Sequence, residues 1–141
     1  MTGKEYMNRI RLIRREIRLL EEQILRDTVF ASNVKAIRYD IDKIQTSPVG
    51  DRMANIISGI VNATDELHER IKLLQEKESE ARTYLLQLRE EHERVLILHY
   101  LDGYKWDVVA DKMNYSEKYI YDIKDKALAE LTEVLKESEQ F

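Results

Sequence analysis

Apolar side chains recur at alternating intervals of four and three residues through the middle of this chain. Over residues 52–88 the alternation covers eleven positions, of which only Thr64 and Glu78 are polar. The apolar members are Met53, Ile57, Ile60, Leu67, Ile71, Leu74, Ala81, Leu85 and Leu88. This spacing is typical of a coiled-coil seam and predicts one helix, about 55 Å long at ~1.5 Å per residue. Such a helix cannot bury its stripe alone, so it needs a partner helix from this chain, from another subunit, or from both.

Residues 4–30 repeat the pattern and predict a second amphipathic helix. Its seam consists of Tyr6, Ile10, Ile13, Ile17, Leu20 and Ile24. Five arginines lie mostly off this seam, namely Arg9, Arg11, Arg14, Arg15 and Arg18. They form either a surface that contacts phosphates or a solvated face that pairs with Glu side chains, and we favour the second interpretation.

The clearest break in the chain is Thr46–Asp51. Pro48 disfavours helical backbone at the residue before it, and Gly50 tolerates positive φ. Asp51 is the expected N-cap of the helix that follows. Before the break, residues 31–45 keep helical spacing and predict a short helix of their own, with apolar positions at Val34, Ile37, Ile41 and Ile44. Residues 1–89 are therefore predicted to form a long helical hairpin or coiled coil that serves in oligomerisation, with its turn near 46–51.

The composition favours an all-α fold. One proline and four glycines leave few helix breaks, and 35% of the residues are charged. The absence of cysteine excludes disulfides, thiolate zinc sites and cysteine nucleophiles. No apolar run approaches the ~20 residues of a membrane span, and the charged N-terminus does not resemble a signal peptide. We expect a cytoplasmic protein with no membrane partner.

Residues 90–141 follow a different pattern, which predicts three shorter helices at 90–101, 106–113 and 117–135. Gly103 suits a left-handed stop after the first helix, and Ser116 suits the N-cap of the third. The expected inward positions are Val95, Leu96, Leu98 and Leu101, then Trp106, Val109, Ala110 and Met113, then Ile120, Ile123, Ala127 and Leu131.

The last two of these predicted helices have the features of a helix-turn-helix. The small side chain of Ala110 permits a steep crossing, and Met113, Tyr115 and Ile120 supply apolar contacts on either side of the turn. The start of the third helix is then free to enter a major groove.

The segment from Met113 to Leu131 resembles, without a gap, the tail of sigma-factor region four. That tail typically reads Leu-Gly-Val-Thr, polar residues, two isoleucines three apart, and Lys-Ala-Leu-x-x-Leu. The counterparts here are MNYS, Ile120, Ile123 and KALAEL, and upstream ERVLILHYLDGYKWDVVA is similar to the first two helices of that region. The resemblance covers residues 91–131 and implies a DNA-binding module.

The wider layout resembles the small phage and prophage regulators of the ArpU/RinA type. These place a helical N-terminal part, and a turn similar to IQTSPVGD, ahead of a sigma-like helix-turn-helix. The resemblance implies an activator of late or packaging genes in a bacterial host cell. The expected partner is double-stranded DNA. The sigma resemblance implies RNA polymerase as a possible second partner, and the coiled-coil seam makes a second copy, bound through the long helices, a possible third.

The expected DNA-reading surface departs from the sigma pattern. Sigma factors commonly carry Arg-Glu-Arg after the N-cap, whereas this chain has Glu117, Lys118 and Tyr119, so a bidentate Arg–guanine contact is not available. The predicted DNA-contacting residues are Lys105, Lys112, Ser116, Glu117, Lys118, Tyr119, Tyr121, Asp122 and Lys124.

The charge of this region also departs from that of a typical DNA-binding module, which is basic. Residues 102–141 carry six Lys/Arg against ten Asp/Glu, while residues 1–45 carry ten against seven. We therefore expect weak DNA binding by the isolated module, reinforced by a second copy, by the basic first helix, or by RNA polymerase.

No catalytic, metal or cofactor motif is evident. His68, His92 and His99 have no third ligand at usual spacing, HExxH is absent, and no Gly-rich phosphate loop occurs. Trp106 is predicted to be a core anchor rather than a stacking platform. We predict that the protein is not an enzyme.

Two other functions stay open. A DNA-packaging subunit similar to small terminases also combines a helix-turn-helix with a coiled coil, and it would form a ring of many subunits. A coiled-coil adaptor that binds only proteins would tolerate substitutions over residues 117–125.

Overall fold

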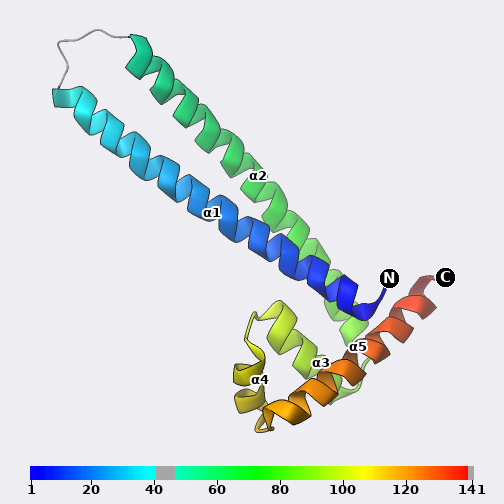
Figure 1. Cartoon of the computed structure of the whole chain (residues 1–141). Helices are drawn as coiled ribbons and strands as arrows, with labels where there is room; N and C mark the ends of the chain where they lie inside the picture. Colours follow the sequence, from blue (N-terminus) through cyan, green and yellow to red (C-terminus); the bar gives the residue numbers. More distant parts are fainter. Residues whose placement is uncertain (41–46, 140–141) are drawn as a thin grey trace. The chain divides into compact units, whose positions relative to one another are not determined.

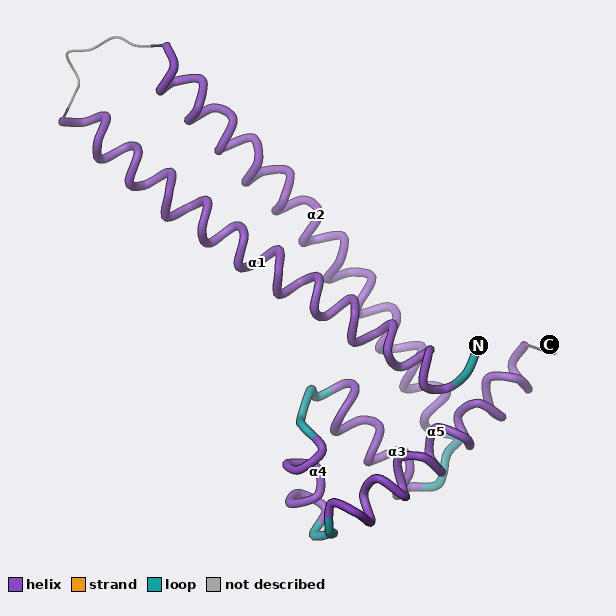
Figure 2. The backbone as a smooth tube through the Cα atoms, in the orientation of Figure 1, coloured by secondary structure: helices purple, strands orange, loops and turns teal. Residues whose placement is uncertain are grey.

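The computed structural model describes residues 1–40 and 47–139, and for residues 34–40 and 47–49 the backbone alone. All its regular structure in these residues is helical, which confirms the all-α prediction (Figures 1 and 2). The helices are α1 (Gly3–Asp40), α2 (Ser47–Leu85), α3 (Glu90–Leu96), the π-helix η1 (Ile97–Leu101), α4 (Trp106–Met113) and α5 (Glu117–Glu139).

The two long helices differ from the prediction at their ends. α1 continues to Asp40 as one helix, where a separate short helix was predicted from residue 31. α2 begins at Ser47, so Pro48 stands in its first turn, where a missing N–H breaks no hydrogen bond. Asp51 consequently lies inside the helix and is not its N-cap, and α2 ends at Leu85 rather than at residue 88. Ile41, Ile44 and the start of the predicted break lie outside the described residues.

The contacts divide the chain into two units, Arg15–Lys72 and the combination of Met1–Arg14 with Leu73–Phe141. We call these the hairpin unit and the head unit. The head unit thus groups the first turns of α1 and the last turns of α2 with all the shorter helices. The division into an oligomerisation region, 1–89, and a DNA-binding region, 90–141, stays a prediction.

In the hairpin unit α1 and α2 run antiparallel (Figure 1). Two features connect these helices. Glu16 of α1 forms an ion pair with Arg70 of α2 at 3.3 Å, and Asp27 of α1 lines a surface hollow together with residues between 51 and 59 of α2. Ile17 is buried on this seam, and its other described members are half-buried except Ile57, which is 51% exposed. The seam prediction therefore identified shielded positions of both helices, although Ala63, which is buried in α2, lies off the predicted seam.

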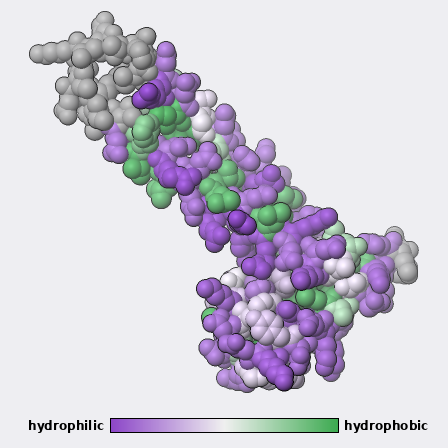
Figure 3. All heavy atoms as spheres, viewed as in Figure 1, coloured by the Kyte–Doolittle hydropathy of each residue, from purple (hydrophilic) through white to green (hydrophobic). Residues whose placement is uncertain are grey.

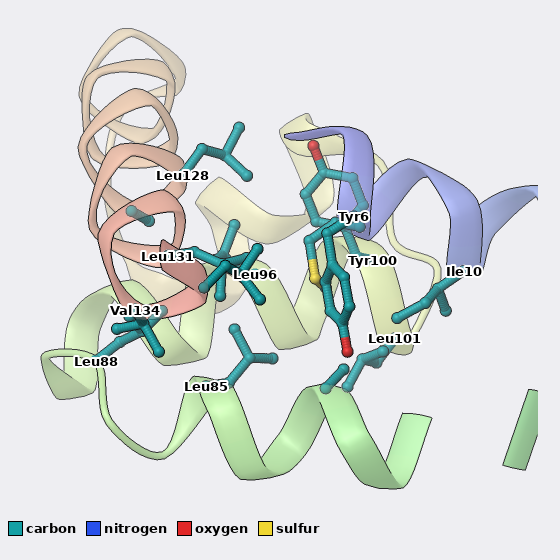
Figure 4. Packing of buried hydrophobic residues seen from close by; sticks show 14 residues of the cluster. Tyr6, Ile10, Leu85, Leu88, Leu96, Tyr100, Leu101, Leu128, Leu131 and Val134 are labelled. Carbon is teal, nitrogen blue, oxygen red and sulfur yellow. The ribbon is translucent and has the colours of Figure 1, made fainter. Parts of the chain in front are cut away.

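The main core of the head unit joins helices from both ends of the chain (Figure 4). Its largest fully buried members are Met7 and Ile10 from α1, Leu85 from α2, Leu96 from α3 and Leu131 from α5. At the start of α1, the Gly3 N–H donates a hydrogen bond to Thr132 Oγ1 at 2.8 Å. The polar seam position Glu78 forms an ion pair with Arg14, so it links α2 to α1.

A smaller core fixes the short helices against one another. It contains Val95, Val109, Ala110, Ile120 and Ile123, all buried. Every position predicted to face inward over residues 95–131 is buried or half-buried. This core therefore holds α3, α4 and the first half of α5 together.

Candidate nucleic-acid interface

The turn between α4 and α5 is built by a residue in left-handed conformation. Asn114 has φ 60° and ψ 40°, and its N–H bonds to the Asp111 carbonyl at 3.2 Å. The Tyr115 N–H bonds to the Ala110 carbonyl at 2.9 Å. These two bonds make a Schellman motif with asparagine in place of the usual glycine. The motif ends α4 and sets the direction in which the chain enters α5.

Ser116 caps α5, as predicted. Its Oγ accepts a hydrogen bond from the Tyr119 N–H at 3.2 Å, and its carbonyl accepts from Ile120 N–H at 3.0 Å. Ile120 is fully buried, and this anchors the first turn of α5. The predicted contact residues around it, Glu117, Lys118, Tyr119, Tyr121 and Asp122, are all exposed.

The four predicted lysines differ in how free they are. Lys105, Lys112 and Lys118 are exposed, although the Lys112 ammonium lies 4.4 Å from the centroid of the Tyr104 ring. The side chain of Lys124 is only 23% exposed. Its ammonium lies 5.0 Å from the Tyr121 ring centroid and 5.6 Å from that of Trp106. Lys124 therefore packs over aromatic rings and is less available for a phosphate than the other three.

Tyr115 was predicted to supply an apolar contact beside the turn, but the structure places it at the surface. Its side chain is 39% exposed and meets Tyr119 edge-to-face at 4.8 Å between ring centroids. The left-handed Asn114 redirects the backbone, so the next residue leaves the apolar face of α4. Hydrogen bonding to the Glu91 carboxylate raises the pKa of the Tyr115 hydroxyl. Sequence reasoning missed this exposed tyrosine because its position depends on the φ angle of the residue before it.

Trp106 is a core anchor, as expected. It is half-buried, packs against both cores of the head unit, and stacks on His99 with 3.8 Å between ring centroids. His99 Nδ1 lies 2.7 Å from the Tyr104 carbonyl oxygen, an acceptor, so this nitrogen carries the proton. The other nitrogen, Nε2, faces the Arg11 guanidinium at 3.4 Å. Burial lowers the pKa of His99, and so do the nearby cations Arg11 and Lys124. The ring is therefore a neutral structural group.

The helix predicted at residues 90–101 forms, but it does not keep α-helical geometry throughout. After Leu96 it widens into the π-helix η1, which ends where the Asp102 N–H bonds to the Ile97 carbonyl at 2.9 Å. His99, Tyr100 and Leu101 are buried in succession there. Gly103 then takes φ 83°, which confirms the left-handed stop predicted at this residue.

His92 and Glu130 form a second buried polar contact. His92 Nδ1 pairs with one carboxylate oxygen of Glu130, and the other oxygen accepts the Arg89 N–H at 3.0 Å. Glu130 thus satisfies a backbone donor at the start of α3 and joins α3 to α5. No group of three metal-ligating side chains occurs in the described part of the chain.

The basic face of the first helix is partly engaged inside the head unit. Arg14 pairs with Glu78 and lies 3.4 Å from the Tyr100 carbonyl oxygen, while Arg11 faces His99. Both guanidinium groups therefore hold α1 against η1. Arg9, Arg15 and Arg18 are exposed and make none of these contacts, whereas Arg14 is half-buried.

No protein-family model matches the chain, and neither does any curated protein or solved structure. Over residues 1–40 and 47–139, no helix is long and apolar enough to cross a membrane.

Proposed function

We propose that the protein is a sequence-specific DNA-binding transcriptional regulator that reads DNA through the start of α5. The observation that carries the proposal is the geometry of α4, the Asn114 turn and α5. A buried Ile120 and a capping Ser116 fix the first turn of α5 and leave Glu117, Lys118, Tyr119, Tyr121 and Asp122 exposed around it. A helix presented in this way suits the major groove.

The chemistry of this surface favours tyrosine and lysine contacts over arginine–guanine pairs. Tyr119 and Tyr121 are 45% and 44% exposed and can donate to phosphates or pack on thymine methyl groups. Glu117 and Asp122 can accept from cytosine amino groups, although both repel phosphates. Glu117 also lies in the first turn of α5, where a carboxylate stabilises the helix dipole.

Because residues 102–141 are acidic as a whole, with six Lys/Arg against ten Asp/Glu, the proposal includes a source of additional affinity. RNA polymerase would supply it, as the resemblance to sigma-factor region four implies. Self-association through the long helices is a second source, and the hairpin unit offers surface for it. Leu19, Leu25, Val29, Phe30, Ile57 and Val61 are each about half exposed or more, and apolar side chains reach the surface along this unit (Figure 3). Exposed apolar side chains in such number favour a protein contact.

The test is selection of bound duplexes from a random DNA library, with and without bacterial RNA polymerase, followed by gel shifts on the selected sequence. Lys118→Glu should weaken DNA binding by about tenfold, since it replaces an exposed cation of the proposed DNA-reading surface with an anion. Lys136→Glu is the matched control. It lies on the same face of α5 but about 27 Å further along the helix at ~1.5 Å per residue.

No enrichment in either selection, or equal loss in the two variants, would refute DNA reading by α5. Sedimentation of the full chain separates the remaining alternatives. A dimer agrees with a regulator, while a ring of many subunits would favour the DNA-packaging function. A protein-only adaptor would keep its function when the surface of residues 117–125 is changed.

A further inference from the structure

The head unit contains a cavity of about 490 Å³ that the proposed DNA-reading surface does not use. It is lined by the first turns of α1, the last turns of α2 and the last turns of α5, and it is partly open to solvent. Small-molecule sites in proteins typically measure ~300–1,000 Å³ and have mostly apolar walls with a few polar groups. Here the apolar walls come from Ile10, Ile13 and Leu135, and from the rings of Tyr6 and Tyr84.

The two tyrosines of the cavity differ in their hydroxyl groups. Their rings meet edge-to-face with 5.8 Å between centroids. The Tyr84 hydroxyl lies 3.2 Å from Ser138 Oγ, whereas the Tyr6 hydroxyl is buried and faces the Glu80 carboxylate. Buried hydroxyls normally have a partner, and the Glu80 carboxylate is the acceptor beside this one. Burial, together with the Glu80 carboxylate, raises the pKa of Tyr6 and keeps its proton in place.

Four charged side chains also line the cavity. Lys77 and Glu80 pair with each other at 3.5 Å. Within residues 1–40 and 47–139, neither Arg9 nor Glu139 takes part in an ion pair. The guanidinium of Arg9 presents a planar set of donors that matches a carboxylate. A ligand with one carboxylate would therefore place that carboxylate against the Arg9 guanidinium and its apolar part away from the Glu139 carboxylate.

We propose that this cavity binds a small amphipathic carboxylate, with its apolar body between Tyr6, Tyr84 and the aliphatic walls and its carboxylate on Arg9. The bound molecule would contact α1, α2 and α5 together and so stabilise their packing by mass action. This site is separate from the proposed DNA surface and does not depend on it.

The test is a titration of the ¹⁵N-labelled full chain with decanoate, followed by amide chemical shifts. Decyltrimethylammonium, which has the same chain length and the opposite charge, is titrated in parallel. Shift changes should concentrate at residues 6–13, 77–84 and 135–139, and decanoate should bind roughly tenfold more tightly than the ammonium. Arg9→Glu should weaken decanoate binding about tenfold, whereas Lys4→Glu, the same change at an exposed residue of α1 outside the cavity, should not.

Two further variants separate ligand binding from a folding defect. Ile13→Trp fills the cavity from a half-buried position and should abolish binding while the far-ultraviolet circular dichroism stays helical. Tyr6→Phe keeps the ring that contacts the apolar body and removes only the hydroxyl beside Glu80, so decanoate should bind about as tightly and shift the same residues. Shifts scattered over both units, equal affinity in the Arg9 and Lys4 variants, or equal binding of decyltrimethylammonium would overturn the proposal.

Discussion

Gly3 occupies the tightest position that any glycine has in the described chain. A Cβ at this residue would lie 2.6 Å from the Leu128 carbonyl oxygen and 3.1 Å from Leu131 Cβ. Both atoms belong to the rigid part of α5, so a side chain would push α1 off α5. The absence of a side chain at residue 3 is therefore what permits the start of α1 to join the head unit.

Gly3→Ala should lower the free energy of unfolding by about 1–3 kcal/mol, as overpacking in a core does. Gly59→Ala is the control, because Gly59 lies within α2 and a Cβ there would meet nothing within 4 Å. That change should raise stability by ~0.5–1 kcal/mol through helix propensity. Urea unfolding followed by circular dichroism measures both, and equal effects would contradict the close approach of α1.

His99 makes the stability of the head unit depend on pH. Burial lowers its pKa below the 6.5 of a free imidazole, so the unfolded chain binds a proton more readily than the folded one. Its contribution is complete above pH 6.5 and is lost as the pH falls toward the lower pKa of the folded state.

Acidification from about pH 7.5 to 5.5 should therefore reduce the free energy of unfolding more in the native sequence than in His99→Asn. Asn retains an N–H for the Tyr104 carbonyl but does not titrate. Parallel pH profiles in the native chain and the His99 variant would show that His99 is not the source.

At the scale of elements, capping decides where the short helices begin and end. Asn114 closes α4 in left-handed conformation, Ser116 opens α5, and the carboxylate of Glu130 holds the Arg89 N–H where α3 begins. Each cap satisfies backbone groups that a helix end leaves without partners. Because α4 has only eight residues, its stability depends on these caps and on its buried face.

Ser116→Ala should cost about 1 kcal/mol of unfolding free energy, since it removes the oxygen that accepts the Tyr119 N–H. Ser116→Asp keeps an acceptor at the N-cap and should restore most of that loss. Thermal unfolding of the three proteins tests this. If the Asp variant is as unstable as the Ala variant, the cap is not what Ser116 contributes.

At the scale of the whole molecule, the two units differ in how much they bury. The hairpin unit has only Ile17 and Ala63 buried among its described residues, while the head unit has two cores with many fully buried side chains. A unit with few buried contacts opens more readily by local unfolding.

Hydrogen exchange measured by mass spectrometry should therefore give protection at least ~10-fold lower over residues 16–32 and 52–70 than over residues 120–134 of α5. The comparison should be made at low protein concentration and again at high concentration. Protection of the hairpin that rises with concentration would support self-association through the long helices. Equal protection of hairpin and head at low concentration would contradict the expected difference.

The sequence determined the helical fold and most of its buried positions. The four-three alternation from Met53 to Leu88 and the spacing from Val95 to Leu131 place apolar side chains on one face of a helix wherever that helix lies, so burial could be predicted locally. Gly103 and Ser116 were also predictable, because a left-handed stop and an N-cap each depend on the chemistry of one residue. The candidate contact residues at the start of α5 followed from Ser116 and Ile120 by helical periodicity.

Only the tertiary structure showed which distant segments pack together. The contact of Gly3 with Leu128, the pairing of His92 with Glu130 and the cavity beside Tyr6 each join residues far apart in the chain, and no local pattern encodes such contacts. Tyr115 and Lys124 show the same limit on a smaller scale. The backbone angle of Asn114 turns Tyr115 outward, and the rings of Trp106 and Tyr121 draw Lys124 inward. Hydrophobic spacing fixes the face of a helix, whereas the partner of that face depends on how the whole chain packs.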